Sequence, residues 1–384
     1  MTCRYDSLVT MLILNFQAAF LFSRTMKSVI VTAIAIASAF VSSAQNGTTD
    51  EPIHYPAEKH LANVRQLTFG GNNAEAYWDF SGEKLSFQSD NKNWTMGCDQ
   101  IFILDTKLEA DSNKRKLLST GNGRTTCAFF MPDNNSVIYA STHLAMDSCP
   151  PVPIKESGKY VWPIYPEYDI FQADLSGKII KQFTDEKGYD AEATVSPKGD
   201  KIIFTSTRSG DLDLWIMDID GKNVKQITST LGYDGGAAFS ADGSQIVWRA
   251  SRPSTPDDIK KYRELLQRDL VEPTNLEIFV ANTDGSNVRQ ITNLGNANWA
   301  PYFHPDGKRV LFCSNHKSKI GFPFNIFMIN VDGTALEQIT FDTQFDSFIM
   351  FSPDGKKVSW CSNRHNGRTR DTNVFVADWV ETQK

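Results

Sequence analysis

Acidic and amide side chains recur at one position of a repeated pattern, and they are candidates for binding a ligand. Counted back from a recurring hairpin turn, this position holds Asn73, Thr125, Asp190, Asp234, Asn298 and Asp346. Two residues later, two repeats carry Glu75 and Glu192, which would face the same side of a strand. If the repeats surround one axis, these carboxylates ring a channel mouth and bind a cation, such as Ca²⁺, or a ligand amino group. The alternative is that each Asp or Asn accepts hydrogen bonds from the backbone of its own loop.

A second set of polar residues follows the next apolar segment of each repeat. This set contains His143, Arg208, Arg252, His316 and Arg364, with Asn91 at the same position of the first repeat. Arginine at such a position is expected to pair with neighbouring acidic or carbonyl groups. His143 and His316, together with His365, are the candidate metal ligands. No HxH or HExxH spacing indicates a preformed metal site, so the sequence predicts no resident cofactor.

Motifs of the common enzyme classes are absent from the sequence. It contains no G-x-S-x-G nucleophile turn, no phosphate-binding P-loop and no dinucleotide-binding glycine pattern. Carboxylates at a channel mouth could act as an acid and base pair, which spacing in the sequence cannot establish. The sequence therefore favours a binding protein over an enzyme and leaves catalysis open.

Three cysteines are expected on one face of the protein. Cys98 and Cys149 fall in loops of neighbouring repeats, and Cys127 begins the segment between them. We predict a disulfide between Cys98 and Cys149, with Cys127 as the alternative partner of either. Cys313 and Cys361 occupy equivalent apolar segments and are expected to be buried thiols.

The repeat that places these residues is clearest over residues 188–228. Four apolar runs of strand length, A to D, are separated there by turn signals, which predicts a four-stranded antiparallel unit. Six such units follow one another, but one D segment, at 64–68, precedes the first A segment. The last unit ends after its C segment, at 373–378. We therefore predict an all-β, six-bladed propeller that the N-terminal strand closes, with no open edge between the chain ends.

The repeat motifs carry a family resemblance. Ser-Pro-Asp-Gly turns, as at 352–355, and Gln-Ile-Thr segments, as at 338–340, resemble the WD40-like (PD40) repeats of TolB-type propellers. The resemblance covers roughly residues 60–380 and implies a six-bladed propeller. The resemblance does not include the separate N-terminal domain of TolB, which we do not expect here. For function the resemblance implies less, because this repeat serves scaffolds, peptidase-associated domains and sugar lyases.

The N-terminal residues predict export. An apolar run after Met26 and Lys27 ends in small residues before Gln45, as in a secretory signal peptide cleaved near Ala44-Gln45. We expect an upstream extension plus signal peptide over 1–44, an extended lead-in over 45–63, the propeller over 64–380, and a periplasmic or secreted monomer. The net charge of −6 argues against binding nucleic acid, and the mature part contains no predicted membrane span.

Insertions indicate which face of the propeller is functional. The long ones all lie between B and C segments, at 143–168, 251–275, 316–324 and 364–371, and the second should contain a helix over 256–270. The face formed by the B–C and D–A loops is thus elaborated, and function normally resides on such loops. We expect a non-enzymatic module that binds a protein, a peptide or a cell-envelope ligand there. The alternative is a hydrolase, lyase or peptidase-associated propeller that acts on oligosaccharide or peptide at the channel mouth.

Overall fold

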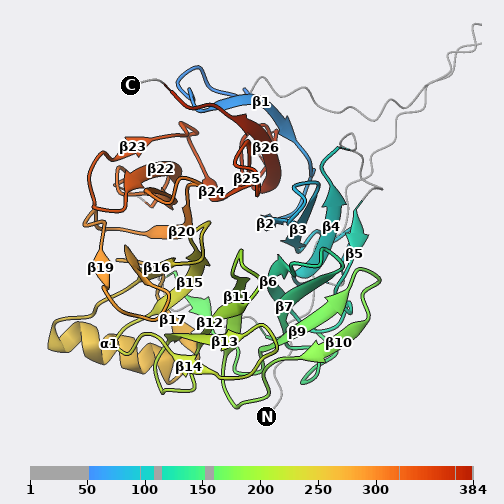
Figure 1. The fold of residues 1–384 in the computed structure, drawn as a ribbon, viewed down its shortest axis with the longest axis vertical. Helices are drawn as coiled ribbons and strands as arrows, with labels where there is room; N and C mark the ends of the chain where they lie inside the picture. Colours follow the sequence, from blue (N-terminus) through green and yellow to red (C-terminus); the bar gives the residue numbers. More distant parts are fainter. Residues whose placement is uncertain are drawn as a thin grey trace, which may run out of the picture. The chain divides into compact units, whose positions relative to one another are not determined.

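The computed structural model describes residues 52–95, 97–107, 115–151, 160–319, 321–367 and 369–382. The predicted signal peptide and its upstream extension lie outside these residues. Residues 47–384 form one compact unit, in which six four-stranded antiparallel sheets surround a central axis (Figure 1). The predicted six-bladed propeller is confirmed.

Each blade has the strand order A-B-C-D, with strand A nearest the axis (Figure 1). Blade 1 comprises β2 (Asn73–Trp78), β3 (Lys84–Ser89), β4 (Gln100–Asp105) and β5 (Lys116–Leu117). Blade 2 comprises β6 (Thr125–Phe130), β7 (Ser136–Ser141), β9 (Asp169–Asp174) and β10 (Ile179–Gln182). Blade 3 comprises β11 (Asp190–Val195), β12 (Lys201–Ser206), β13 (Asp213–Asp218) and β14 (Lys225–Gln226).

The other three blades repeat this arrangement. Blade 4 comprises β15 (Asp234–Phe239), β16 (Gln245–Ala250), β18 (Glu277–Asn282) and β19 (Arg289–Gln290). Blade 5 comprises β20 (Asn298–Phe303), β21 (Arg309–Ser314), β22 (Asn325–Asn330) and β23 (Glu337–Gln338). Blade 6 comprises β24 (Asp346–Phe351), β25 (Lys357–Ser362), β26 (Asn373–Trp379) and β1 (Leu61–Gln66).

Every blade contributes an aromatic side chain to the hydrophobic core from the same position of its B strand. The fourth residue of every B strand is a fully buried aromatic: Phe87, Tyr139, Phe204, Trp248, Phe312 and Trp360. Several of these rings stack on the aromatic ring of the adjacent C strand, as Trp248 does on Phe279 at 5.7 Å. Burying such a side chain stabilises the fold by about 1.5–3 kcal/mol, so each blade contributes its own share of the core.

The Thr or Ser that ends each D segment anchors the outer edge of its blade. Its hydroxyl accepts a hydrogen bond of 2.7 to 2.9 Å from the backbone N–H of the second C-strand residue in all six blades. The anchoring residues are Thr68, Ser119, Thr184, Thr228, Thr292 and Thr340. The Gln-Ile-Thr pattern thus marks a structural contact.

Strand β1 closes the ring, as the sequence predicted. It pairs antiparallel with β26, with Leu61 opposite Trp379 and Gln66 opposite Phe375. Thr68 then accepts from the Val374 N–H at 2.8 Å, across 306 positions of the chain. The strand begins at Leu61, three residues before the predicted start at 64, because its pairing with β26 extends past the apolar run that marks it in the sequence.

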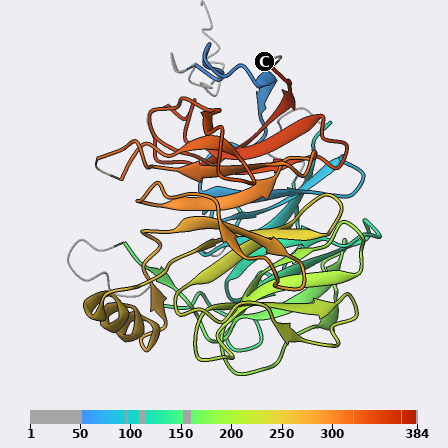
Figure 2. The same ribbon diagram turned by 60° about the vertical axis from the view of Figure 1, so that its left-hand side comes forward.

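Two insertions meet on the elaborated face. The predicted helix in the blade 4 insertion is α1 (Pro256–Leu266), and Thr255 caps it by accepting from the Asp258 N–H at 3.2 Å. It ends four residues earlier than predicted, since the chain then forms β17 (Leu270–Val271), which pairs with β8 (Trp162–Pro163) of the blade 2 insertion. Figure 2 shows α1 lying beside the blades. No helix in the described part of the chain combines the length and apolarity that crossing a membrane requires.

Candidate functional site

A β-bulge near the start of every A strand determines which side chains reach the channel. The pairing of A with B shifts register there in all six blades. The third residue of each A strand is left-handed, with φ from +47° to +61°: Glu75, Cys127, Glu192, Gly236, Ala300 and Phe348. For a residue other than glycine this conformation costs about 1–2 kcal/mol. All six bulge residues line the channel.

The first residues of the A strands are buried within the blades instead of ringing the channel mouth. The prediction that they form an acidic ring there is therefore wrong. Asn73, Thr125, Asp190, Asp234, Asn298 and Asp346 are at most 1% exposed, and Thr125 is the one member among the residues that line the channel cavity. The prediction placed them on the same side as the bulge residues by strict strand alternation. The bulge breaks that alternation.

Ion pairs explain the three buried aspartates. Asp190 pairs with Arg208 at 2.7 Å, Asp234 with Arg252 at 2.6 Å, and Asp346 with Arg364 at 2.7 Å. Each arginine follows the B strand of the same blade. Burial raises the pKa of Asp234 to about 6 although Arg252 opposes the shift. These residues hold the A and B strands of one blade together.

The other three blades replace the ion pair by neutral groups. In these blades the A strand begins with Asn73, Thr125 or Asn298. The second residue after strand B, where the other blades have Arg, is then Asn91, His143 or His316. The His143 Nδ1 and the Ser141 Oγ are 2.9 Å apart, and its ring packs on Phe171 at 4.4 Å.

His316 makes the same two contacts in blade 5, with Ser314 and Phe327. Burial lowers the pKa of both histidines, and neither lines the cavity. Among the described residues, no three His, Cys, Asp or Glu side chains are grouped as a metal site would require.

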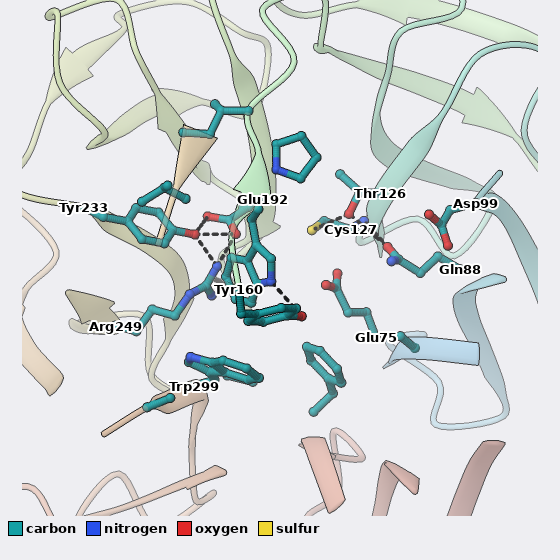
Figure 3. Close-up of a pocket in the computed structure, with 18 of the residues that line it drawn as sticks. Glu75, Gln88, Asp99, Thr126, Cys127, Tyr160, Glu192, Tyr233, Arg249 and Trp299 are labelled. Carbon is teal, nitrogen blue, oxygen red and sulfur yellow. Dashed lines mark hydrogen bonds and ion pairs between the residues drawn. The ribbon is translucent and has the colours of Figure 1, made fainter. Parts of the chain in front are cut away.

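A cavity of about 940 Å³ occupies the channel on the elaborated face. One side of it is a continuous series of aromatic rings, which we call the aromatic wall: Tyr160, Trp162, Trp299, Phe324, Phe345 and Phe348. Successive ring centroids lie 4.4 to 6.4 Å apart. Figure 3 shows Tyr160 and Trp299 facing the cavity. Tyr160 and Trp162, from the insertion of blade 2, therefore line the channel.

Glu192 and Arg249 form a buried ion pair beside the aromatic wall (Figure 3), with the Arg249 guanidinium over the Trp162 ring. The Glu192 carboxylate also accepts from the Thr205 hydroxyl at 2.7 Å, the Gly236 N–H at 2.9 Å and the Tyr233 hydroxyl at 3.0 Å. Arg249 donates to the Tyr233 oxygen as well. The carboxylate is thus saturated with donors and fixed in place.

The glycines of blade 4 make room for this pair. A Cβ on Gly236 would lie 1.8 Å from the Arg249 Nη1, and one on Gly235 would lie 2.5 Å from the Glu192 Oε2. The sequence did not point to Arg249, nor to the residues of the aromatic wall. Arg249 is the one charged residue at the fifth position of the six B strands. This charge, in the blade whose A strand carries Gly235 and Gly236, was the feature of the sequence that could have indicated a role for Arg249.

Glu75 projects into the cavity from blade 1 (Figure 3). Burial raises the pKa of Glu75 to about 7, and the negative charge of Glu192 adds to the shift, while Cys127 and Arg249 oppose it. The Tyr77 hydroxyl donates to the Glu75 Oε2 at 3.4 Å. Glu75 therefore gains or loses a proton near neutral pH.

A disulfide fixes the loops beside this part of the cavity. Cys98 and Cys149 are bonded, with Cα atoms 5.7 Å apart, and Cys127 is a free buried thiol. Burial raises the pKa of the Cys127 thiol well above its usual range, so it is not a thiolate nucleophile. Cys313 and Cys361 are buried and free.

Comparison with solved structures identifies the fold. An Agrobacterium tumefaciens protein assigned as TolB matches with a TM-score of 0.51 and 17% sequence identity, over 83% of this chain and 97% of that chain. The chain has the TolB-type propeller fold. TolB of Acinetobacter baumannii also matches, with a TM-score of 0.49 and 17% identity over 81% of this chain and 64% of that one.

Other similar structures have different names. An oligogalacturonate lyase in complex with manganese has a TM-score of 0.46 and 15% identity, over 85% of this chain and 96% of that chain. No protein-family model matches the sequence, and no curated protein matches it. The assignment of the TolB-type repeats as PD40 therefore stays a prediction.

Proposed function

We propose that the protein is an exported binding module, and that it holds a peptide or another cell-envelope ligand in the aromatic-walled cavity. The observation that carries this proposal is the cavity itself. Its volume of about 940 Å³ is in the range of sites for small molecules or short chain ends, which are mostly apolar with a few fixed polar groups. The aromatic wall supplies the apolar surface, and Glu75, Glu192 and Arg249 supply the polar groups.

Two observations support the cellular setting. The Cys98–Cys149 disulfide is the kind of bond that persists in oxidising compartments, which fits the predicted periplasmic or secreted location. The TolB-type fold is consistent with a binding or scaffold role. Both observations support our proposal of a cell-envelope ligand, without identifying it.

A second candidate function, an acid–base enzyme acting on oligosaccharide or peptide, is favoured by one observation. Glu75 lies in the cavity with a pKa near 7, which suits a general acid or base. Glu192, whose charge acts on Glu75, is held by Arg249 and three further donors, so it is not available as a second free carboxylate. Incubation with envelope saccharides and peptides, followed by mass spectrometry, separates this candidate from simple binding.

The binding function is tested by removing the exposed part of the aromatic wall. Tyr160 is 51% exposed and lines the cavity, so Tyr160→Ala should leave the melting temperature unchanged and weaken ligand binding. Loss of one stacked aromatic is expected to cost about 0.5–1.5 kcal/mol, a two- to tenfold weaker Kd. The readout is tryptophan fluorescence during titration with envelope peptides and saccharides.

Ile180→Ala is the matched control, since Ile180 is 50% exposed and lies on β10 outside the cavity. Ligands that bind Tyr160→Ala as tightly as the unchanged protein would place the binding surface elsewhere. A panel with no binding ligand would remove the support for this function.

A further inference from the structure

We propose that the cavity recognises an ammonium group on an apolar or aromatic ligand, and that Glu75 is the residue that holds it. This inference rests on the proposed binding function and specifies its ligand class. It follows from the distribution of charge in the cavity and from the nature of the wall around it.

Among the described residues, four carboxylates line the cavity, and three of these four have a cationic partner. Glu192 pairs with Arg249, Asp99 with Arg124 at 3.1 Å, and Glu272 with Lys261. Glu75 has none among the described residues. Its contacts there are the Tyr77 hydroxyl and the Cys127 thiol, both neutral groups.

A carboxylate without a counter-charge in a partly dry cavity is costly. A ligand that brings one positive charge would relieve this cost, and its binding would be strengthened accordingly. The carboxylate of Glu192 does not compete for the ligand's positive charge, because it already accepts from Arg249 and three further donors. The cavity therefore offers one anionic position, at Glu75.

The surroundings favour an organic cation over a metal ion. Ca²⁺ takes six to eight oxygen ligands and Mg²⁺ takes six, whereas Glu75 offers a single carboxylate amid Tyr77, Cys127 and aromatic rings. Ammonium groups, in contrast, are attracted to the faces of Trp, Tyr and Phe. Arg249 already shows this contact inside the site, with its guanidinium 5.3 Å from the Trp162 ring centroid. The aromatic wall would take the apolar body of the ligand.

The ammonium group could belong to a small amine or to the N-terminus of a peptide, and paired probes distinguish them. Phenethylamine is compared with 2-phenylethanol, which has the same shape without the charge. Phenylalanyl-alanine amide is compared with its N-acetylated form. Calorimetric titration of the full-length mature protein should give each ammonium probe a Kd about 10- to 100-fold lower than its neutral partner, as a charged hydrogen bond predicts.

Glu75→Gln should abolish this preference, because the amide keeps the shape and removes the charge. Glu272→Gln is the control, since it removes a cavity carboxylate that Lys261 already neutralises, and it should retain the preference. If both ammonium probes show the effect, the class is amines in general. If only the peptide pair shows it, the class is peptide N-termini.

Equal affinity for charged and neutral probes would overturn the inference, and so would a preference that survives Glu75→Gln. If neutral probes bind equally well and Tyr160→Ala weakens them, the binding function stands while the ammonium inference falls. If no probe binds in either form, the ammonium inference falls, and the titration with envelope peptides and saccharides decides the binding function separately. Melting temperatures of each variant show that the fold is retained.

Discussion

Glu75 should make the fold less stable as the pH rises, and Glu75→Gln should remove this effect. The pKa of Glu75 lies near 7 in the folded protein and near 4.5 in the unfolded chain. Between these values the folded state holds a proton that the unfolded state has lost, so stability falls as the pH rises. Over 2.5 pH units, from 4.5 to 7, this amounts to about 3 kcal/mol.

The variant should therefore match the unchanged protein near pH 4.5 and exceed its stability above pH 7. For a propeller of this size, about 3 kcal/mol corresponds to roughly 4 to 5 °C in Tm. Thermal unfolding followed by circular dichroism, at intervals across this pH range, measures the difference. The groups facing Glu75 are Tyr77, Cys127, Glu192 and Arg249, and they are the same in both proteins.

Glu192→Gln should change the melting temperature in the opposite direction from Glu75→Gln. It leaves the buried Arg249 guanidinium without its anionic partner, and breaking a buried pair in this way costs about 3–5 kcal/mol. That variant should melt lower at every pH. A Tm difference between Glu75→Gln and the unchanged protein that does not vary with pH would refute the reasoning, since it would mean that folding does not perturb the Glu75 proton.

Two further predictions concern closure and the disulfide. Deleting the chain through Thr68 removes β1 and opens the ring, so thermal unfolding should occur at a clearly lower temperature; an unchanged Tm would contradict closure by β1. Thr68→Val alone removes the hydroxyl that contacts Val374 and should cost about 1 kcal/mol in denaturant unfolding, as should Thr340→Val in an internal blade. Cys149→Ser releases a bond between residues 51 positions apart and should cost up to about 4 kcal/mol. Mass mapping that finds Cys98 and Cys149 free in the native protein would contradict the bond.

The repeat made the fold predictable. Turn signals and apolar runs of strand length marked each strand, and the displaced D segment at 64–68 indicated how the ring closes. The D segment ends in Thr in five repeats and in Ser119 in the other, so the sequence displays the pattern, and the structure adds the hydrogen bond that this hydroxyl accepts. Strand ends were less predictable, as with β1, because pairing with β26 continues beyond the apolar run.

The site was only partly predictable because a backbone irregularity determines it. The sequence pointed to Glu75 and Glu192, and both line the cavity. It also pointed to Asp190, Asp234 and Asp346, which the bulge leaves buried beside arginines. The sequence did contain a sign of these ion pairs. Three repeats have Asp at the first position and Arg at the second, and the other three have neutral residues at both. The aromatic wall joins rings from three blades, and no local pattern shows which loops meet there.

Closure by β1 also constrains how the protein folds. Strand β1 is synthesised early, but its partner, β26, lies near the end of the chain, with Leu61 opposite Trp379. The strands of blades 1 to 5 each come from one continuous stretch of the chain and can form as the chain lengthens, whereas blade 6 is complete only when β1 pairs with β26. Because such distant pairing is slow, we expect an open intermediate in which the edge of β26 is unpaired before closure. Unpaired edges invite association with other chains, so the interval before β1 docks is when the protein is most exposed to aggregation.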